Sequence, residues 1–298
     1  MSRTVSPSSH KPYGVARVAG VWGLARSSFY AARQRRQYPR PAAKRGPKVH
    51  SDDELLVEIR KLLSAPVFTG EGYRKIWARL RHQGIRTSKD RVLRLLRQHQ
   101  LLSPARQPEP PPINPHEGTI VTDAPQQMWG TDATQTSTDE DGTVTIFAAI
   151  DHCTAECVGI HVVKRAVRFE ALEPIRQGMH EYFGGFSAGV AAGLRLRHDH
   201  GSVYMSGDFQ QEVRFLGIEP SPAFVRQPEG NGCIERFFRT LKEQLLWIRR
   251  FRDLAELREA LQAFRHRYNH HWIVERLGYQ TPVQARLSFA PLETPIAA

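Results

Sequence analysis

One stretch decides the fold: RQPEGNGCIERFFRTLKEQL, residues 226–245. Its first half contains Pro228, Gly230 and Gly232, which fix φ or permit positive φ and therefore predict a loop. Asn231 stands where a helix N-cap would stand, and no Gly or Pro follows Gly232 for fifteen residues. The apolar residues then recur at steps of three and four, which predicts the buried stripe of an amphipathic helix: Ile234, Phe237, Phe238, Leu241 and Leu245.

A second stripe of the expected helix carries charge. Glu235, Arg239 and Lys242 fall at i, i+4 and i+7, so one carboxylate and two cations share a face. The simplest interpretation is a surface ion pair between Glu235 and Arg239, which would stabilise the helix only weakly. The alternative is that Glu235 points outward and completes a site built elsewhere in the chain. The upstream sequence favours this alternative.

Two further carboxylates stand in strand-like segments. LRLRHDHGS, residues 194–202, alternates apolar and polar residues and then breaks, which predicts a strand with Asp199 at its end. MWGTDATQT, residues 128–136, places Asp132 inside a short Thr-rich strand pattern. Three carboxylates on separate elements are what a two-metal phosphoryl-transfer site requires, because Mg²⁺ prefers oxygen ligands and keeps open positions for phosphate.

Taken together, these motifs resemble the DDE catalytic core of insertion-sequence transposases in the retroviral-integrase superfamily. The resemblance is carried by WGTD ending at Asp132, by HDxGSxYxS around Asp199, and by GNxxxERFFxTLK around Glu235. Thirty-five residues separate Asp199 from Glu235, a spacing typical of that superfamily. LGYxTP at 277–282 resembles the family's closing segment, so that the likeness covers about residues 50–290.

The resemblance implies a ribonuclease H-like fold and DNA strand-transfer chemistry. Asp132, Asp199 and Glu235 would be the catalytic residues and the ligands of two Mg²⁺ ions, with Mn²⁺ able to substitute. The substrate would be double-stranded DNA, both the ends of a mobile element and the target, and the protein would act as a homo-oligomer on DNA. Val203 and Gly230 stand where the family often has Gln and Asp, but the three acids are intact.

Charge divides the chain into two halves. Residues 1–112 carry 23 Lys and Arg against 7 Asp and Glu, a net charge of +16, whereas the remainder has a net charge of −4. Such asymmetry predicts a part that binds a polyanion joined to a part with another task.

No run approaches 18 apolar residues and no signal-peptide pattern opens the chain. We therefore expect a soluble cytoplasmic protein, associated with the nucleoid, and no membrane partner.

The basic half is predicted to contain two helix-turn-helix units. The first is a short helical pair at 13–36, and the second has three helices, expected at 52–63, 73–81 and 88–99. Helix 88–99 is the predicted recognition helix, in which Lys89, Arg91 and Arg94 would contact DNA. The alternative is a basic helical bundle with a solvated face. In the other half, Asn231, Arg239 and Lys242 are the predicted DNA-binding residues.

A proline-rich run separates the two halves. Residues 104–115 contain six prolines and no apolar period, which favours an extended polyproline II spacer.

The predicted fold class is an α/β ribonuclease H-like catalytic core with an all-α helix-turn-helix N-terminal region. The predicted domains are a basic arm with the first helix-turn-helix at 1–47, a DNA-binding domain at 48–103, a linker at 104–117, the catalytic core at 118–290 and a tail at 291–298.

The second half reads as three strands followed by alternating helices and strands. Strands are expected at 129–136, 144–150, 157–163 and 194–198, helices at 169–183 and 209–216, and an extended segment at 218–225. This order predicts a mixed α/β domain, which agrees with a ribonuclease H-like layout.

Other residues compete for the site. Asp151 lies at a strand end and is interpreted as a turn residue, Asp139 and Asp141 flank a hairpin glycine and are expected to be solvated, and Glu229 belongs to the loop before the helix. His198 and His200 flank Asp199, but alternate side chains of an extended run point in opposite directions, so both cannot easily bind the ion that Asp199 binds. The three cysteines, Cys153, Cys157 and Cys233, lack partners at zinc spacing and are predicted to be reduced thiols.

Two classes of function fit these features. The first is a DNA transposase that cleaves the ends of its element and joins the 3′-hydroxyls to target DNA by two-metal phosphoryl transfer. The second is a non-catalytic DNA-binding regulator whose α/β domain only scaffolds or oligomerises. A metal-dependent nuclease without strand transfer lies between them. Intact acids at all three positions favour the enzyme.

Overall fold

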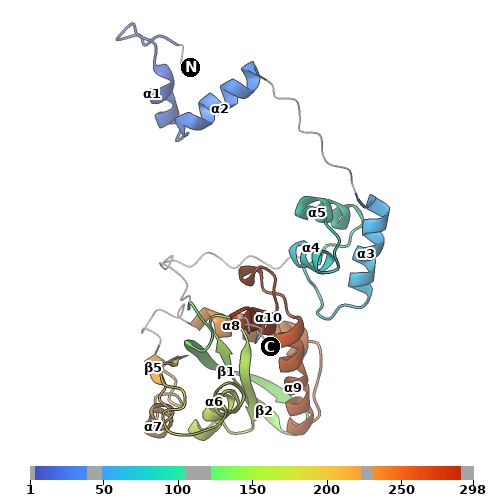
Figure 1. Cartoon of the computed structure of the whole chain (residues 1–298), viewed down its shortest axis with the longest axis vertical. Helices are drawn as coiled ribbons and strands as arrows, with labels where there is room; N and C mark the ends of the chain where they lie inside the picture. The colour runs from blue at the N-terminus through green and yellow to red at the C-terminus, as the bar shows by residue number, and fades with distance from the viewer. Residues whose placement is uncertain (1–3, 39–48, 105–121, 223–230, 290–298) are drawn as a thin grey trace, which may run out of the picture. The chain divides into compact units, whose positions relative to one another are not determined.

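The computed structural model describes residues 4–38, 49–104, 122–222 and 231–289, and the chain forms two compact units, Met1–Ser51 and Asp52–Ala298 (Figure 1). The smaller unit contains α1, Gly14–Val21, and the basic α2, Arg26–Gln37, so the predicted helical pair is confirmed. The loop with Glu229, the tail and nearly all of the predicted linker at 104–117 lie outside the described residues.

Three helices open the larger unit: α3, Asp52–Ser64, α4, Tyr73–His82, and α5, Lys89–Gln98. They share a small apolar core that includes Ile59, Leu80 and Val92, all fully buried. The Ser88 side chain accepts the Arg91 N–H at 3.2 Å and so caps the start of α5. The three helices predicted from the sequence are therefore confirmed.

A five-stranded sheet of order β3-β2-β1-β4-β5 forms the centre of the larger unit. Its strands are β1, Met128–Thr138, β2, Gly142–Asp151, β3, Cys157–Val163, β4, Arg195–His198, and β5, Glu219–Pro222. The first three strands form an antiparallel meander, whereas β4 pairs in parallel with both β1 and β5. The predicted mixed α/β architecture is confirmed.

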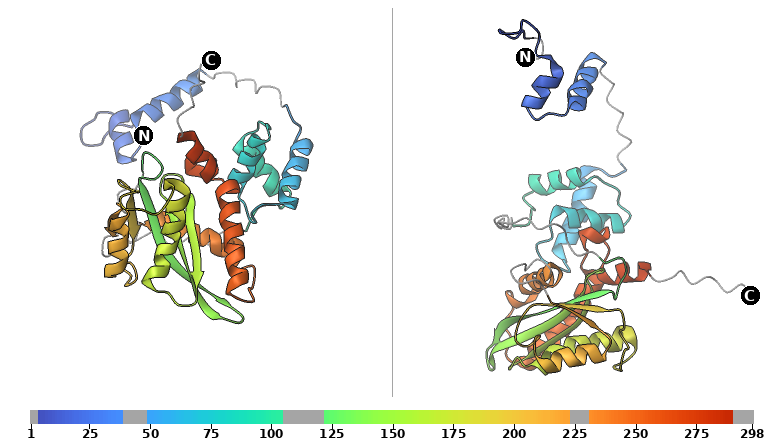
Figure 2. Two further views of the ribbon diagram at one scale, coloured as in Figure 1. Left: turned by 60° about the horizontal axis from the view of Figure 1, so that its bottom comes forward. Right: turned by 90° about the vertical axis from the view of Figure 1, so that its left-hand side faces the viewer.

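Helices cover both faces of the sheet (Figures 1 and 2). They are α6, Arg168–Phe183, and α7, Gly207–Phe215, on one face, and α8, Gly232–Leu241, with α9, Leu254–His271, on the other; α10, Pro282–Phe289, follows. Strand β2 contributes to both cores because its side chains alternate: Ile146 packs with α8 and α9, whereas Phe147 packs with α6 and α7. All three cysteines are free thiols.

Two glycines let α6 lie close against the sheet. A Cβ atom on Gly159 of β3 would lie 2.0 Å from the Pro174 carbonyl oxygen of α6, and one on Gly178 of α6 would lie 2.5 Å from the Trp129 ring of β1. Real Cβ atoms do not approach other atoms so closely, so any other residue at these positions would push α6 away from the sheet. The buried Trp129 depends on this close packing.

The structure differs from the sequence-based expectation at three places. The predicted helix at 231–245 is an α-helix only to Leu241 and then widens into a π-helical turn, Lys242–Leu246. Asp141, expected to be solvated, is only partly exposed, and its Oδ2 accepts the Leu254 N–H at 2.8 Å at the start of α9. Helix α9 itself was not predicted.

In the described ranges, no helix is long and apolar enough to cross a membrane.

The contact between β3 and α6 gives a stability prediction. Gly159→Ala is expected to lower the free energy of unfolding by about 1–3 kcal/mol, because α6 has to move to admit the methyl group. The measurement is urea denaturation of the full chain followed by circular dichroism. Gly185→Ala is the control, since nothing lies within 4 Å of a Cβ there. Equal denaturation midpoints for the two variants would show that α6 does not depend on this close contact.

Candidate active site

The three predicted acids come from three elements that meet at one edge of the sheet. Asp132 lies within β1, Asp199 follows the last residue of β4, and Glu235 lies in the first turn of α8. In the parallel pairing of β1 with β4, Gly130 is opposite Arg197. Asp132 and Asp199 each follow this pair by two residues, and the charge of Asp199 contributes to the raised pKa of Asp132.

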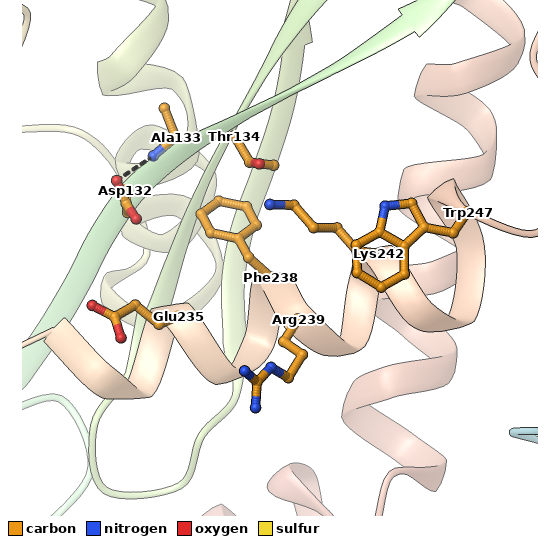
Figure 3. A pocket seen from close by; sticks show the side chains of 8 residues that line it. All are labelled: Asp132, Ala133, Thr134, Glu235, Phe238, Arg239, Lys242 and Trp247. Atoms are coloured by element: carbon orange, nitrogen blue, oxygen red, sulfur yellow. Dashed lines mark hydrogen bonds between the residues drawn. The ribbon is translucent and has the colours of Figure 1, made fainter. Parts of the chain in front are cut away.

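Asp132 and Glu235 face the same cavity, which has a volume of about 310 Å³ (Figure 3). Asp132 enters it from β1, and Glu235 enters it from α8, with both carboxylates at the same end of the cavity. Arg239 and Lys242 line the same cavity, so the charged stripe predicted from the sequence lies along it. The remaining lining residues are Ala133, Thr134, Phe238 and Trp247.

The electrostatics of the cavity disfavour ionised carboxylates in the absence of a cation. Burial raises the pKa of Asp132 to about 6; the negative charges of Asp199 and Glu235 add to this rise, while the Ala133 N–H and the Lys242 ammonium oppose it. Burial also raises the pKa of Glu235, against the opposing charge of Arg236. Carboxylates whose pKa values are raised by burial and by their neighbours are typical of sites that bind a cation or transfer protons.

The charge of Asp199 acts on Asp132, but Asp199 does not line the cavity that Asp132 and Glu235 share. It is exposed, and its Oδ1 accepts the Gly201 N–H at 2.9 Å. In the ranges that the structure describes, no three His, Cys, Asp or Glu side chains form a group that could hold a metal ion. The fold therefore brings the predicted acids to one edge without closing them around one point.

Aromatic packing holds the segment that carries Asp199. His198 is buried, its ring stacks on Tyr204 with centroids 5.7 Å apart, and its Nδ1 lies 2.7 Å from the Asp199 carbonyl oxygen. Burial lowers the pKa of His198, which favours the neutral ring. His200 is exposed on the other side of Asp199. The opposite placement of the two histidines agrees with the expectation that they do not share an ion with Asp199.

Gly130 allows the start of α8 to rest directly on β1. A Cβ atom at this position would lie 2.7 Å from His152 Nε2 and 2.9 Å from Asn231 Oδ1. Asn231 is buried, and its Nδ2 donates to the Thr131 carbonyl oxygen at 3.2 Å rather than capping the helix. The predicted N-cap position of Asn231 is confirmed, although its side chain makes no capping hydrogen bond. Its predicted contact with DNA stays a prediction.

Asp151, the strongest rival acid, has a structural role. It is fully buried at the end of β2, where its Oδ1 accepts both the backbone N–H and the hydroxyl of Thr154, and its Oδ2 accepts the Gln126 N–H. Burial raises its pKa, whereas these hydrogen bonds oppose the rise. The interpretation of Asp151 as a turn residue is confirmed.

The cations predicted for the recognition helix make contacts within the larger unit. Lys89 Nζ donates to the Tyr279 hydroxyl at 3.3 Å. Arg91 and Arg94 both pair with Asp52 of α3, at 2.5 Å and 2.6 Å. These contacts fix the direction of the three side chains, and their contact with DNA stays a prediction.

Sequence reasoning missed Trp247 as a residue of the site. A large apolar side chain near the end of an amphipathic helix ordinarily belongs to the core, and the sequence contains no feature that separates Trp247 from that case. Its place in the cavity follows from the π-helical turn that precedes it.

Comparisons with known families match both halves of the chain. A model described as an integrase core domain matches residues 216–282, and a model described as an HTH-like domain matches residues 50–109. Among curated proteins, the chain is 29% identical over 241 residues to the transposase InsD for insertion element IS2A/D/F/H/I/K of Escherichia coli, covering 78% of each chain. The transposase InsD for insertion element IS2-9 of Escherichia coli K12 is also 29% identical, over 78% of this chain and 77% of its own.

Solved structures give weaker matches. A chain of the simian T-cell lymphotropic virus intasome in complex with PP2A regulatory subunit B56 gamma is 20% identical, with a TM-score of 0.49 over 81% of this chain and 77% of its own. The HTLV-2 integrase catalytic core domain in complex with magnesium is 17% identical, with a TM-score of 0.42 over 55% of this chain and 98% of its own.

The raised pKa of Asp132 predicts a pH-dependent stability difference. The folded-state pKa of about 6 exceeds the usual 3.8, so ionised Asp132 destabilises the fold above pH 6, and this cost disappears as the pH falls below 3.8. In metal-free buffer, Asp132→Asn is expected to raise the free energy of unfolding by roughly 1–3 kcal/mol at pH 8 and by almost nothing at pH 4. Urea denaturation of the variant and the parent between pH 4 and pH 8 measures this difference in the free energy of unfolding, with the exposed Asp139→Asn as control. A difference that does not change with pH would contradict the electrostatic account.

Proposed function

We propose that this chain, which has an integrase core domain with a ribonuclease H-like fold and is homologous to insertion-element transposases, is a DNA transposase that cleaves the ends of a mobile element and joins their 3′-hydroxyls to target DNA. One observation supports the proposal most strongly. An acid of β1 and an acid of α8 face one cavity, which is also lined by Arg239 of α8 and by Lys242 of the π-helical turn that follows.

The acids fit a divalent metal in their chemistry. Their donors are carboxylate oxygens, which Mg²⁺ prefers, and ionising them together is unfavourable until a cation is bound. Asp132 and Asp199 would hold two Mg²⁺ ions, or Mn²⁺ in their place, and Glu235 would complete one of the two sites. Bound there, the ions would supply Lewis-acid stabilisation of the attacking and leaving oxygens.

The chain's own residues have separate tasks in this proposal. Asp132 is mostly ionised at neutral pH, since its pKa is about 6. Asp199 Oδ1 accepts the Gly201 N–H, and its carboxylate would still have oxygen lone pairs to offer a metal ion. In the first step, water attacks the phosphorus at the element end and a 3′-hydroxyl leaves. In the second step, that hydroxyl attacks a target phosphodiester, a new phosphodiester forms, and a target 3′-oxygen leaves.

Arg239 and Lys242 would position the DNA. They lie about 6 Å and about 10.5 Å further along the helix than Glu235, which is far enough to reach phosphates next to the scissile one. Cations at this distance fix the register of the backbone without reading its sequence. The simple ion pair of Glu235 with Arg239 remains the alternative for this stripe.

The basic half would bind the ends of the element. Its net charge of +16 supplies attraction to phosphates, and α5 with Lys89, Arg91 and Arg94 supplies a candidate recognition helix. The domain boundaries at 47/48, 103/104 and 117/118 belong to this proposal, as does assembly into a homo-oligomer on DNA in the cytoplasm.

Substitution of the acids tests the chemistry. Asp132→Asn, Asp199→Asn and Glu235→Gln are each expected to reduce Mg²⁺-dependent cleavage and joining by at least about 100-fold, because each removes a metal ligand, while DNA affinity is largely kept. The assay follows labelled DNA containing the genomic sequence on either side of the reading frame. Asp139→Asn serves as the control. Near-normal joining by any of the three variants would refute the assignment of that acid, and cleavage without joining by the parent protein would identify a nuclease.

The cation stripe gives a separate prediction. Replacement of both Arg239 and Lys242 by Ala is expected to weaken joining and to reduce the slope of log affinity against log salt by about 2. The control is Arg214→Ala with Arg258→Ala, which removes the same charge from exposed positions outside the cavity. If the two double variants have the same slope and the same joining rate, the stripe is structural.

A further inference from the structure

The helix that carries Glu235 changes its winding where it leaves the cavity. After Leu241 the chain follows a π-helical turn, Lys242–Leu246, and the Trp247 N–H donates to the Lys242 carbonyl oxygen at 2.9 Å. This hydrogen bond spans five residues instead of the four of an α-helix. The turn is anchored by buried Gln244, whose amide accepts the Thr69 N–H and donates to the Thr69 carbonyl oxygen, each at 2.9 Å.

The wider turn determines which side chain follows Lys242 along the cavity. In a continued α-helix, Trp247 would lie roughly 140° around the axis from Lys242, because each residue adds about 100°. The five-residue turn instead returns position 247 to the side of Lys242. Figure 3 shows the Trp247 ring beside the Lys242 side chain, in the wall that also contains Glu235 and Arg239. The π-helical turn therefore adds an aromatic ring to the charged stripe.

Trp247 is not part of the apolar core. Its side chain is 70% exposed, whereas Trp129 in the sheet is fully buried. Its position in a cavity wall leaves the face of the ring available to a ligand. The ligand has to suit both the flat ring and the adjacent cations, Arg239 and Lys242.

We propose that Trp247 is a stacking platform for an unpaired nucleobase of the DNA bound in this cavity. A nucleobase presents a flat π-face to the ring, and the phosphates on either side of it present negative charge to the cations. Duplex ends lose their pairing at low cost, and a base held out of the stack gives a phosphate-transfer site access to the backbone beside it. This inference rests on the proposed function, since it concerns the same DNA substrate.

The alternative occupant of this surface is a second copy of the chain. Ile248, which follows Trp247, is also exposed, and two exposed apolar residues could pack against a partner. The charge of the cavity favours DNA, because the ring lies next to two cations at the place where a negatively charged backbone has to pass. The experiment distinguishes the two occupants.

The experiment measures binding and does not depend on activity. Fluorescence anisotropy in EDTA compares two 20-base-pair duplexes of one sequence, one fully paired and one with three unpaired bases at an end. The parent protein is expected to prefer the forked duplex by about tenfold, Trp247→Ala is expected to lose this preference, and Trp247→Phe is expected to keep most of it. Ile248→Ala, the exposed neighbour that does not line the cavity, is expected to bind like the parent.

Each other outcome overturns the inference. Equal binding of the two duplexes by the parent protein, or an unchanged preference in Trp247→Ala, would show that the ring does not stack on a base. A change in oligomeric state of Trp247→Ala by light scattering, with the forked preference intact, would assign the ring to a protein interface. Loss of cleavage in the acid variants leaves this binding test unaffected, so failure of the proposed chemistry and failure of the stacking platform can be told apart.

Discussion

The contact of α8 with β1 at Gly130 is the constraint on which the site depends. Because residue 130 has no side chain, His152 and Asn231 fill the space where a Cβ would lie, and the first turn of α8 rests on the strand. Asn231 fixes this arrangement through its hydrogen bond to the Thr131 carbonyl oxygen. Asp132 is two residues beyond Gly130 on the strand, and Glu235 is one turn beyond Asn231 on the helix. The contact of the Asn231 side chain with Gly130 therefore sets the separation of the two carboxylates.

The charges in the cavity oppose the stability of the fold. Burial and two neighbouring carboxylates raise the pKa of Asp132, so the ionised form is the unfavourable one in the free protein. Lys242 offsets part of this cost from the next turns of the same helix. A fold selected for stability alone would replace at least one of the acids, whereas a fold that binds cations and phosphates uses the unbalanced charge as binding energy.

Local patterns in the sequence predicted the positions of the acids well, because each is marked by its neighbours. The alternation of LRLRH ends at Asp199, and the apolar stripe of 234–245 fixes the outward face of Glu235. Features that depend on distant contacts were not predictable. The π-helical turn is anchored by Thr69, 175 residues away, and Asp141 pairs with the start of α9, 113 residues away. The direction of the Asp199 carboxylate depends on a hydrogen bond within its own loop, which no residue pattern specifies.

The central claim is that Asp132, Asp199 and Glu235 together form a site for divalent cations. Diffraction data collected at the manganese absorption edge, from crystals of the full chain soaked in Mn²⁺, test it directly. The account predicts an anomalous peak within roughly 2.5 Å of carboxylate oxygens from both Asp132 and Asp199, with the Asp199 side chain rotated away from Gly201. A map without a peak between these two carboxylates, at a Mn²⁺ concentration that gives peaks elsewhere on the protein, would contradict the account.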